Sequence, residues 1–400
     1  MTAAGERANQ IIWWGGVATM LAALALFRPV VAFVIHEQVD YANHLAYLRD
    51  VLDGGPVGTL LSYFPHFLYH GLVYVVSRFG PSLMDASLVV ALAGYGLGAL
   101  MVYTALVRFA GRPSAIGGAA SLAAAALALM LAMPVNLFTP DNLYLGYIVT
   151  HAYHNPTMVT LKPLALLVSM LAAGIFSSRG WHPPLGIVAL VAVLCVAAKS
   201  SYALALLPAL AVMTADAVIR RQSVEWARLA AVAAPTAAVL GAQALLFRHT
   251  SGIIWAPLAV MQAWAGTINP LADDGLGAKL ALSILFPAAV VIVCWPAVRH
   301  DRYLRLSWLA FGAGAFYTYF LAESGERLGH ANFTWSGQIT AFILFVASAA
   351  CAIRFVRDSG GRLRGLLLAA IFSLHLASGW HWYQIHVNAV WMGDIITNLW

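Results

Sequence analysis

The sequence predicts an all-α protein that crosses a membrane many times. Hydrophobic residues make up 62% of the 400 residues and charged residues only 10%, whereas soluble domains average about 45–50% and 25%. So few charges cannot cover the core of a water-soluble fold of this length. Apolar runs of roughly 18–25 residues also recur along the chain, which is the length that a helix needs to span a bilayer.

The apolar runs define the expected spans in order. The first run, residues 11–35, exceeds the roughly 7–15 apolar residues of a signal peptide, so we expect it to remain as an anchor. Later runs lie near 84–108, 115–133, 161–178, 228–247, 279–298, 304–321, 336–353 and 364–380. The stretch 185–217 is apolar except around Lys199, so its composition fits either one long span or two short ones.

The distribution of basic residues decides between these two alternatives. Short cytoplasmic loops collect Lys and Arg, and a split at Lys199 with the N-terminus inside puts twice as many of them inside as outside. This topology predicts about eleven transmembrane helices, N-in and C-out. The chain is then a single transmembrane domain over residues 1–400, with no separate soluble domain.

The same topology places most of the acids and histidines outside. The outer segments are long, aromatic and rich in His and Asp: 36–80, 135–160, 248–278, 322–335 and 381–400. The 22 basic residues are too scattered for a nucleic-acid stripe, so no nucleic-acid partner is expected. The three cysteines lie in apolar runs without a Cys-x-x-Cys pair, which argues against disulfides and thiolate metal sites. We therefore expect function at the outer face.

An acidic motif opens the first outer segment, 36–80, where we expect amphipathic helices. Glu37, Asp40, Tyr41 and His44 share one face if this part is helical. A carboxylate just outside a membrane helix can act as a general base if burial raises its pKa or a cation aligns it. The alternative is a solvated amphipathic helix on the membrane surface.

Two histidines follow at the spacing of metal ligands on a helix. His66 and His70 stand four residues apart, but Phe67 occupies the position where a zinc protease needs Glu. The surrounding aromatic residues favour an interfacial helix instead.

The segment 135–160 carries a helix-start signal. In Asn155-Pro156 an N-cap residue precedes a first-turn proline, so a helix should begin there with its amide end at the outer face. An anion could bind at that end beside His154 and Lys162. The alternative is that Asn155 only caps the helix.

Four further residues offer cations or a sugar-stacking surface. Lys199 stands at the break between two short spans, where phosphate or carboxylate would be its partner unless it only snorkels. Arg28, within the first span, is a second candidate of this kind. The loop 323–335 supplies Arg327 for an anionic ligand and the indole of Trp335 for a sugar ring, or else is a solvated turn. We expect this loop to converge with 36–47 and Lys199.

These features together resemble the GT-C superfamily of polytopic glycosyltransferases, which use polyprenyl-phosphate sugars as donors. The motifs that carry the resemblance are Glu37-x-x-Asp40-Tyr41, the Asn155-Pro156 loop and Lys199-Ser200-Ser201-Tyr202. The resemblance implies that Asp40 or Glu37 lies at the catalytic centre. The chain departs from larger members in having no soluble outer domain, and it has no paired Asp-Asp in the first loop, which leaves metal dependence open.

The chemistry of such a transfer assigns roles to these residues. Asp40 would be the base, with Glu37 and His44 as its supports, and Lys199 and Arg327 would hold the phosphate. Further substrate-binding candidates are Arg28, Tyr41, His154, Asn155 and Trp335. The expected partners are a polyprenyl-phosphate sugar, a glycan, lipid or protein acceptor, and the lipids of a bacterial-type inner or plasma membrane. No cofactor is required by the sequence, and a divalent metal stays open.

Two other classes fit the same features. A transporter or flippase for isoprenoid-linked or anionic solutes would use the cations for binding alone, but it should show inverted repeats and polar residues on both sides of the midplane. A polymerase or ligase of lipid-linked glycans would share both the outer loops and the substrates.

Overall fold

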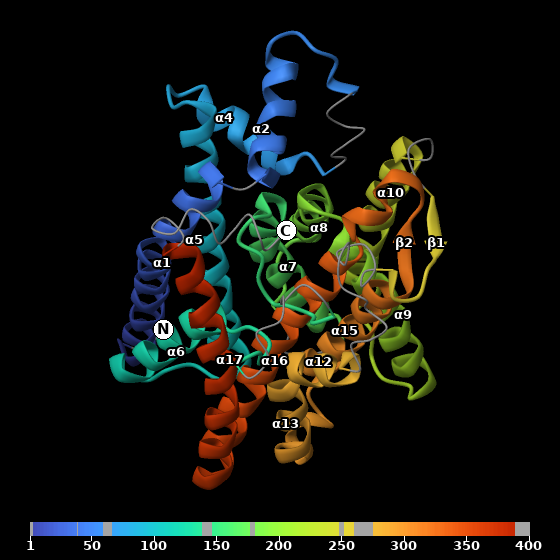
Figure 1. Ribbon diagram of the computed structural model, residues 1–400. Coiled ribbons are helices and arrows are strands. Elements are labelled where there is room, and N and C mark those ends of the chain that lie inside the picture. The colour runs from blue at the N-terminus through green and yellow to red at the C-terminus, as the bar shows by residue number, and fades with distance from the viewer. Residues whose placement is uncertain are drawn as a thin grey trace.

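The computed structural model describes residues 3–37, 39–58, 66–137, 146–176, 181–247, 252–259 and 275–388. Within these ranges the chain is nearly all helical (Figure 1). The helices are α1 (Ala3–Glu37), α2 (Val39–Leu52), α4 (Leu68–Ser77), α5 (Leu83–Phe109), α6 (Ile116–Leu129), α7 (Pro156–Gly174), α8 (Leu185–Ala198), α9 (Ser201–Ile219), α10 (Trp226–Phe247), α12 (Leu276–Ser283), α13 (Leu285–Val293), α14 (Trp295–Val298), α15 (Arg302–Phe320), the short 3-10 helix η1 (Gly325–His330), α16 (Thr334–Ser359) and α17 (Arg362–Asn388).

The described residues do not confirm the predicted count of eleven spans. Seven helices among the described residues are long and apolar enough to cross a membrane, namely α1, α5, α7, α9, α10, α16 and α17. The pair α12 and α13, bent by 63°, makes an eighth if it counts as one span. The apolar helices α6 and α8 have only 14 residues each, about 21 Å, against a hydrocarbon core of about 30 Å.

Apolar runs in the sequence and helix lengths in the structure differ for a physical reason. The apolar run 115–133 continues past the end of α6 at Leu129 into irregular backbone. Apolar residues outside a helix raise the mean hydropathy of a window without adding to the length of the helix. The long apolar helices support an integral membrane protein.

One predicted helix break and one predicted helix start are confirmed. The apolar stretch 185–217 divides at Lys199, which has extended backbone between α8 and α9. Helix α7 starts at Pro156 with Asn155 as its N-cap.

One small sheet departs from the all-α prediction. Strand β1 (Ile253–Trp255) pairs antiparallel with β2 (Leu321–Glu323). The partners are far apart in sequence, and each strand has only three residues, too few for an alternating pattern to reveal. The sheet joins two of the predicted outer segments.

The core lies around α7 and α16, the two candidate spans with the most buried windows. Small residues let the helices approach closely, as is common between membrane helices. A Cβ atom on Gly314 of α15 would overlap Thr340 and Ser336 of α16, and one on Gly94 of α5 would overlap Val159 of α7.

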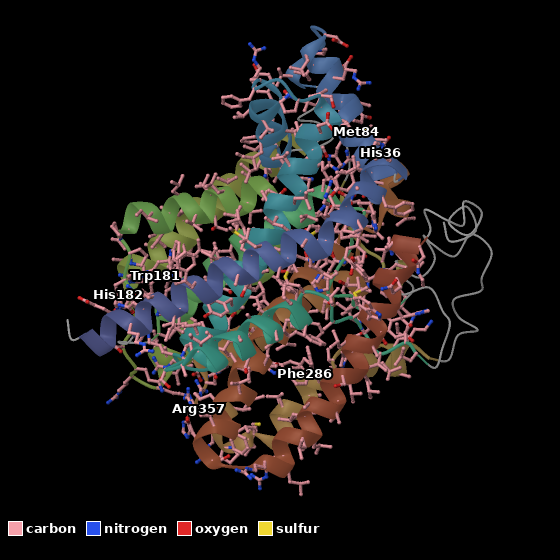
Figure 2. The ribbon with its side chains drawn as sticks, turned by 90° about the vertical axis from the view of Figure 1, so that its left-hand side faces the viewer. His36, Met84, Trp181, His182, Phe286 and Arg357 are labelled. Carbon is pink, nitrogen blue, oxygen red and sulfur yellow. The ribbon has the colours of Figure 1, made fainter. Side chains whose placement is uncertain are left out.

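The helices of the first predicted outer segment lie at one end of the molecule. Figure 1 shows α2 and α4 beyond one end of the bundle, with α13 and the start of α17 at the other. Figure 2 shows Trp181, His182 and Arg357 toward the end where α1 begins, and His36 and Met84 toward the opposite end.

Candidate functional site at the start of helix α7

The first turn of α7 forms the centre of a polar site. The Asn155 Oδ1 atom accepts hydrogen bonds from the Met158 amide (3.0 Å) and the Thr157 hydroxyl (2.8 Å). This is the N-cap arrangement, and Pro156 fits the next position because it has no amide hydrogen to leave unpaired. The positive end of the α7 dipole therefore points into the site.

The same asparagine connects α7 to the first outer segment. Its Nδ2 atom donates to Asp40 Oδ2 at 3.2 Å, across 115 positions of sequence. Asp40 lies in the first turn of α2 and is half-buried, while Asn155 is buried. A carboxylate that accepts a hydrogen bond from an amide donor is held in one orientation.

Lys199 reaches the same turn of α7 from the break between α8 and α9. Its Nζ atom donates to Thr157 Oγ1 at 3.0 Å and lies 4.9 Å from the centre of the Trp335 ring. The residue is only 6% exposed. Burial lowers the pKa of Lys199 to about 8, and the negative charges of Asp40 and Glu323 oppose that shift. The ammonium is thus mostly charged at neutral pH but close to its titration.

The segment after β2 supplies a second carboxylate and a second cation. Glu323 accepts a hydrogen bond from Asn332 Nδ2, and the Arg327 guanidinium lies 3.9 Å from the other oxygen of this carboxylate. Pairing with β1 fixes the backbone at Glu323. Arg327 therefore enters the site already paired with an acid.

The site histidines are neutral groups. Burial lowers the pKa of His154 to about 4, and the charge of Lys199 lowers it further in the same direction. Burial, followed by the charge of His70, holds the pKa of His44 well below its usual range. His44 Nδ1 lies 2.9 Å from His70 Nε2, and the His154 ring lies 5.8 Å from that of Trp335. These imidazoles offer hydrogen bonds and ring surface rather than positive charge.

The predicted pair His66 and His70 does not share a helix. Helix α4 begins at Leu68, so His66 precedes it, and His70 contacts His44 instead. Among the described residues no group of three His, Cys, Asp or Glu side chains is placed to hold a metal ion.

Several predicted site residues lie elsewhere. Lys162 contacts His151 and the Phe342 ring, deeper along α7 than the expected anion site. Arg28 is exposed on α1, and no contact among the described residues joins it to the site. Tyr41 is fully buried with its ring against Tyr69, so it faces α4.

Part of the acidic motif lies beyond what the structure describes. Glu37 is the last residue of α1, and its side chain is outside the described residues, as is that of Glu326. Asp141 and Asn142 also fall outside them. The motif is represented in the site by Asp40 and His44.

Sequence reasoning missed three polar groups at this site. Thr157 links Lys199 to the cap of α7, and Glu323 adds negative charge beside Lys199. Gln338, three residues after Trp335 on α16, is 1% exposed, and neither of its amide atoms has a partner among the described residues. A glutamine inside an apolar span was the available signal, because membrane helices rarely hold polar side chains without a use.

The arrangement combines an oriented carboxylate, a buried ammonium and an indole surface. These come from α2, the break before α9 and the start of α16, three places far apart in sequence. Comparison with family models, with curated proteins and with solved structures finds no match for this chain. The interpretation of the site therefore rests on its own geometry and chemistry.

Proposed function

We propose that the protein is a membrane glycosyltransferase that moves a sugar from a polyprenyl-phosphate donor to an acceptor at the outer face of the membrane. One observation carries the proposal. A carboxylate (Asp40) and a buried cation (Lys199) bind the same first turn of α7, through Asn155 and Thr157, which are two residues apart.

The carboxylate suits the acceptor half of the reaction. Displacement at the anomeric carbon needs a base that takes the proton of the attacking hydroxyl. Asp40 is half-buried and held by the Asn155 amide, so its position is set before the acceptor arrives. With one carboxylate as base, the displacement inverts the configuration of the sugar carbon.

The cations suit the donor half. The leaving phosphate gains charge as the bond to the sugar breaks, and preorganised donors stabilise that charge most in a site shielded from water. Lys199 and the amide end of α7 supply this stabilisation, and Arg327 can contribute if its contact with Glu323 opens. The Trp335 indole beside Lys199 offers an apolar face to the sugar ring.

The test is a transfer assay with purified protein in liposomes. Wild-type protein should move radiolabelled sugar from a synthetic polyprenyl-phosphate donor to an acceptor mixture. Asp40→Asn should lower turnover by about 10²–10⁴-fold with donor binding kept, because the amide cannot accept the proton. The matched control is Asp53→Asn, an exposed acid beyond the end of the same helix.

Two outcomes would overturn the proposal. Equal turnover in wild type and Asp40→Asn would show that Asp40 is not the base. Absence of transfer together with movement of labelled lipid or solute across the bilayer would make the protein a transporter.

The orientation of the site is a separate part of the proposal. We infer that the N-terminus is cytoplasmic and that α2 lies outside. An impermeant thiol reagent should label Asp53→Cys but not Ser359→Cys in intact cells. The three native cysteines are buried, so they add little background. Labelling only at position 359 would show that the orientation in the membrane is the reverse of the one inferred.

A further inference from the structure

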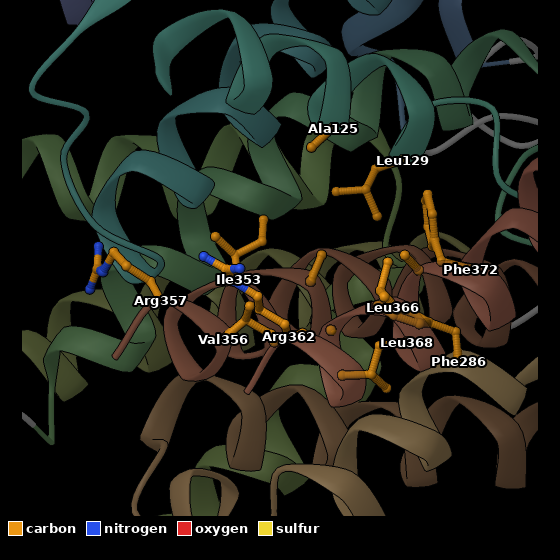
Figure 3. A pocket seen from close by; sticks show the side chains of 14 residues that line it. Ala125, Leu129, Phe286, Ile353, Val356, Arg357, Arg362, Leu366, Leu368 and Phe372 are labelled. Atoms are coloured by element: carbon orange, nitrogen blue, oxygen red, sulfur yellow. The ribbon is translucent and has the colours of Figure 1, made fainter. Parts of the chain in front are cut away.

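A second site lies between helices at the end of the molecule away from α2. A groove of about 730 Å³ separates α6, α13, α16 and α17 (Figure 3). Its size falls in the range of about 300–1,000 Å³ that is typical of small-molecule sites. Nearly all of its wall is apolar, and none of the residues placed in the candidate active site contributes to it.

The groove is apolar along its length and has arginines toward one end (Figure 3). Figure 3 shows Phe286 and Phe372 at one end and Arg357 and Arg362 toward the other. Ala125, Leu129 and Ala369 are among the small and aliphatic residues that line it. A ligand that fits must be apolar over most of its length and negatively charged at one end.

The arginines of the α16–α17 turn differ in how their charge is used. Arg354 donates to the buried Asp301 at 2.6 Å, and Arg364 lies over the Phe355 ring. Within the described part of the chain, the acid that pairs with Arg357 is the neighbouring Asp358, and both side chains are more than half exposed. An exposed pair of this kind contributes little, so a phosphate can replace the carboxylate.

Arg362 has the most available charge of the four. Among the described residues no acidic side chain pairs with its guanidinium, although it lines the groove. Basic pockets between membrane helices are typical binding sites for anionic lipid headgroups. Two cations thus stand at the mouth of an apolar groove with a single exposed carboxylate between them.

We propose that this groove binds an anionic glycerophospholipid, with an acyl chain along Leu129 and Phe372 and the phosphate at Arg362 and Arg357. The site lies far from the proposed catalytic centre, since Arg357 and His36 are toward opposite ends of the molecule (Figure 2). The lipid is therefore a structural or regulatory ligand rather than the sugar donor. The proposal does not depend on the proposed reaction.

The test compares lipids that differ in headgroup alone. Purified full-length protein in detergent is incubated with phosphatidylglycerol or phosphatidylcholine of identical acyl chains, and bound lipid is counted by native mass spectrometry. Wild type should retain phosphatidylglycerol preferentially. Arg362→Gln should weaken retention about fivefold and the double variant with Arg357→Gln about thirtyfold, because each cation near anionic lipid contributes a similar increment.

Two further variants separate charge from shape. Arg364→Gln removes a cation from the same turn that does not line the groove, so it should leave retention unchanged. Ala369→Trp fills the groove from an exposed position, so it should reduce binding of both lipids without disturbing the core.

Specific results would overturn the assignment. The assignment is wrong if the two lipids are retained equally. It is also wrong if neither the double variant nor Ala369→Trp changes retention, because the groove would then contact membrane lipid only non-specifically. If polyprenyl phosphate is retained more strongly than phosphatidylglycerol, the occupant of the groove is polyprenyl phosphate and not a phospholipid.

Discussion

Lys199 and Lys162 are two buried lysines beside the same helix, but their neighbours carry different charges. Lys199 donates to Thr157 near the start of α7 and lies in the field of Asp40 and Glu323. Lys162, farther along α7, contacts an imidazole, His151, and an aromatic ring, Phe342. Burial alone does not distinguish them, since both are nearly inaccessible.

The two lysines differ in whether charged groups surround their amines. Two carboxylates keep the Lys199 ammonium charged in a site at the end of the helices, where an anionic substrate could exchange with them. Lys162 has an imidazole, that of His151, and an aromatic ring, that of Phe342, as its partners within the bundle. We infer that Lys199 serves substrate binding and Lys162 serves packing.

The largest expected effect is the loss of sugar transfer when Lys199, but not Lys162, is replaced. Lys199→Met should reduce sugar transfer by about 10²–10³-fold, the typical loss when one preorganised donor to a developing negative charge is removed. Lys162→Met should keep transfer within about threefold of wild type. Initial rates in the liposome assay measure both, and similar losses in the two variants would erase the distinction.

Removing the partner of Lys162 sharpens the comparison through stability. His151→Leu should lower the free energy of unfolding by about 1–3 kcal/mol, since it leaves the buried Lys162 amine without its partner. Lys162→Met/His151→Leu should recover part of that loss, because no amine is then left without a partner, whereas the Leu129 carbonyl still loses its contact with His151. Thermal or denaturant unfolding in detergent gives both values, and a double variant less stable than His151→Leu would contradict the packing role.

The pH profile provides a test specific to Lys199. Its pKa of about 8 predicts that donor use falls about tenfold per unit above pH 8, as the ammonium loses its proton. Lys199→Arg should remove this alkaline limit, although geometry costs some activity. A profile of kcat/KM against pH tests this, and an identical limit in the arginine variant would assign it to another group.

The same pKa has an opposite consequence for stability. In the folded state the pKa of Lys199 is lowered from 10.5 to about 8, so between these values the unfolded chain holds the extra proton. Stability attributable to this group therefore rises with pH across that window, while activity falls. Unfolding midpoints of wild type and Lys199→Met between pH 8 and 10 should converge as pH increases.

The smallest effect concerns Glu323. Glu323→Gln removes one of the two negative charges that oppose the lowering of the Lys199 pKa. The alkaline limit should move to lower pH by a fraction of a unit, with little change in transfer at pH 7. Asp358→Asn, an exposed acid at the opposite end, is the control that should not move it.

The sequence was most informative where local chemistry decides the structure. The Asn155 cap followed from an Asn-Pro pair, and the break at Lys199 followed from a cation inside an apolar stretch. Helical runs were found because hydrophobicity is a local property. Hydropathy does not report where a helix such as α6 ends, so the number of full spans stays a prediction.

The contacts that define the site depend on tertiary packing. Nothing near Asp40 in the sequence indicates that Asn155 will bind it, and nothing near Lys199 indicates the contact with Trp335. The expectation that the outer segments converge came from topology, but the partners within them came only from the structure. Glu323 illustrates this, since its position depends on the unpredicted strand pair.

The double use of Asn155 limits which residues can replace it. Asp, Ser and Thr are ordinarily good substitutes for Asn at the start of a helix because each offers an oxygen acceptor. Here the side chain must also present a hydrogen to a carboxylate, and aspartate has none to give at neutral pH. Asn155→Asp would keep the helix cap but bring two negative charges together. Aspartate can therefore replace Asn155 as a cap but not as the donor to Asp40.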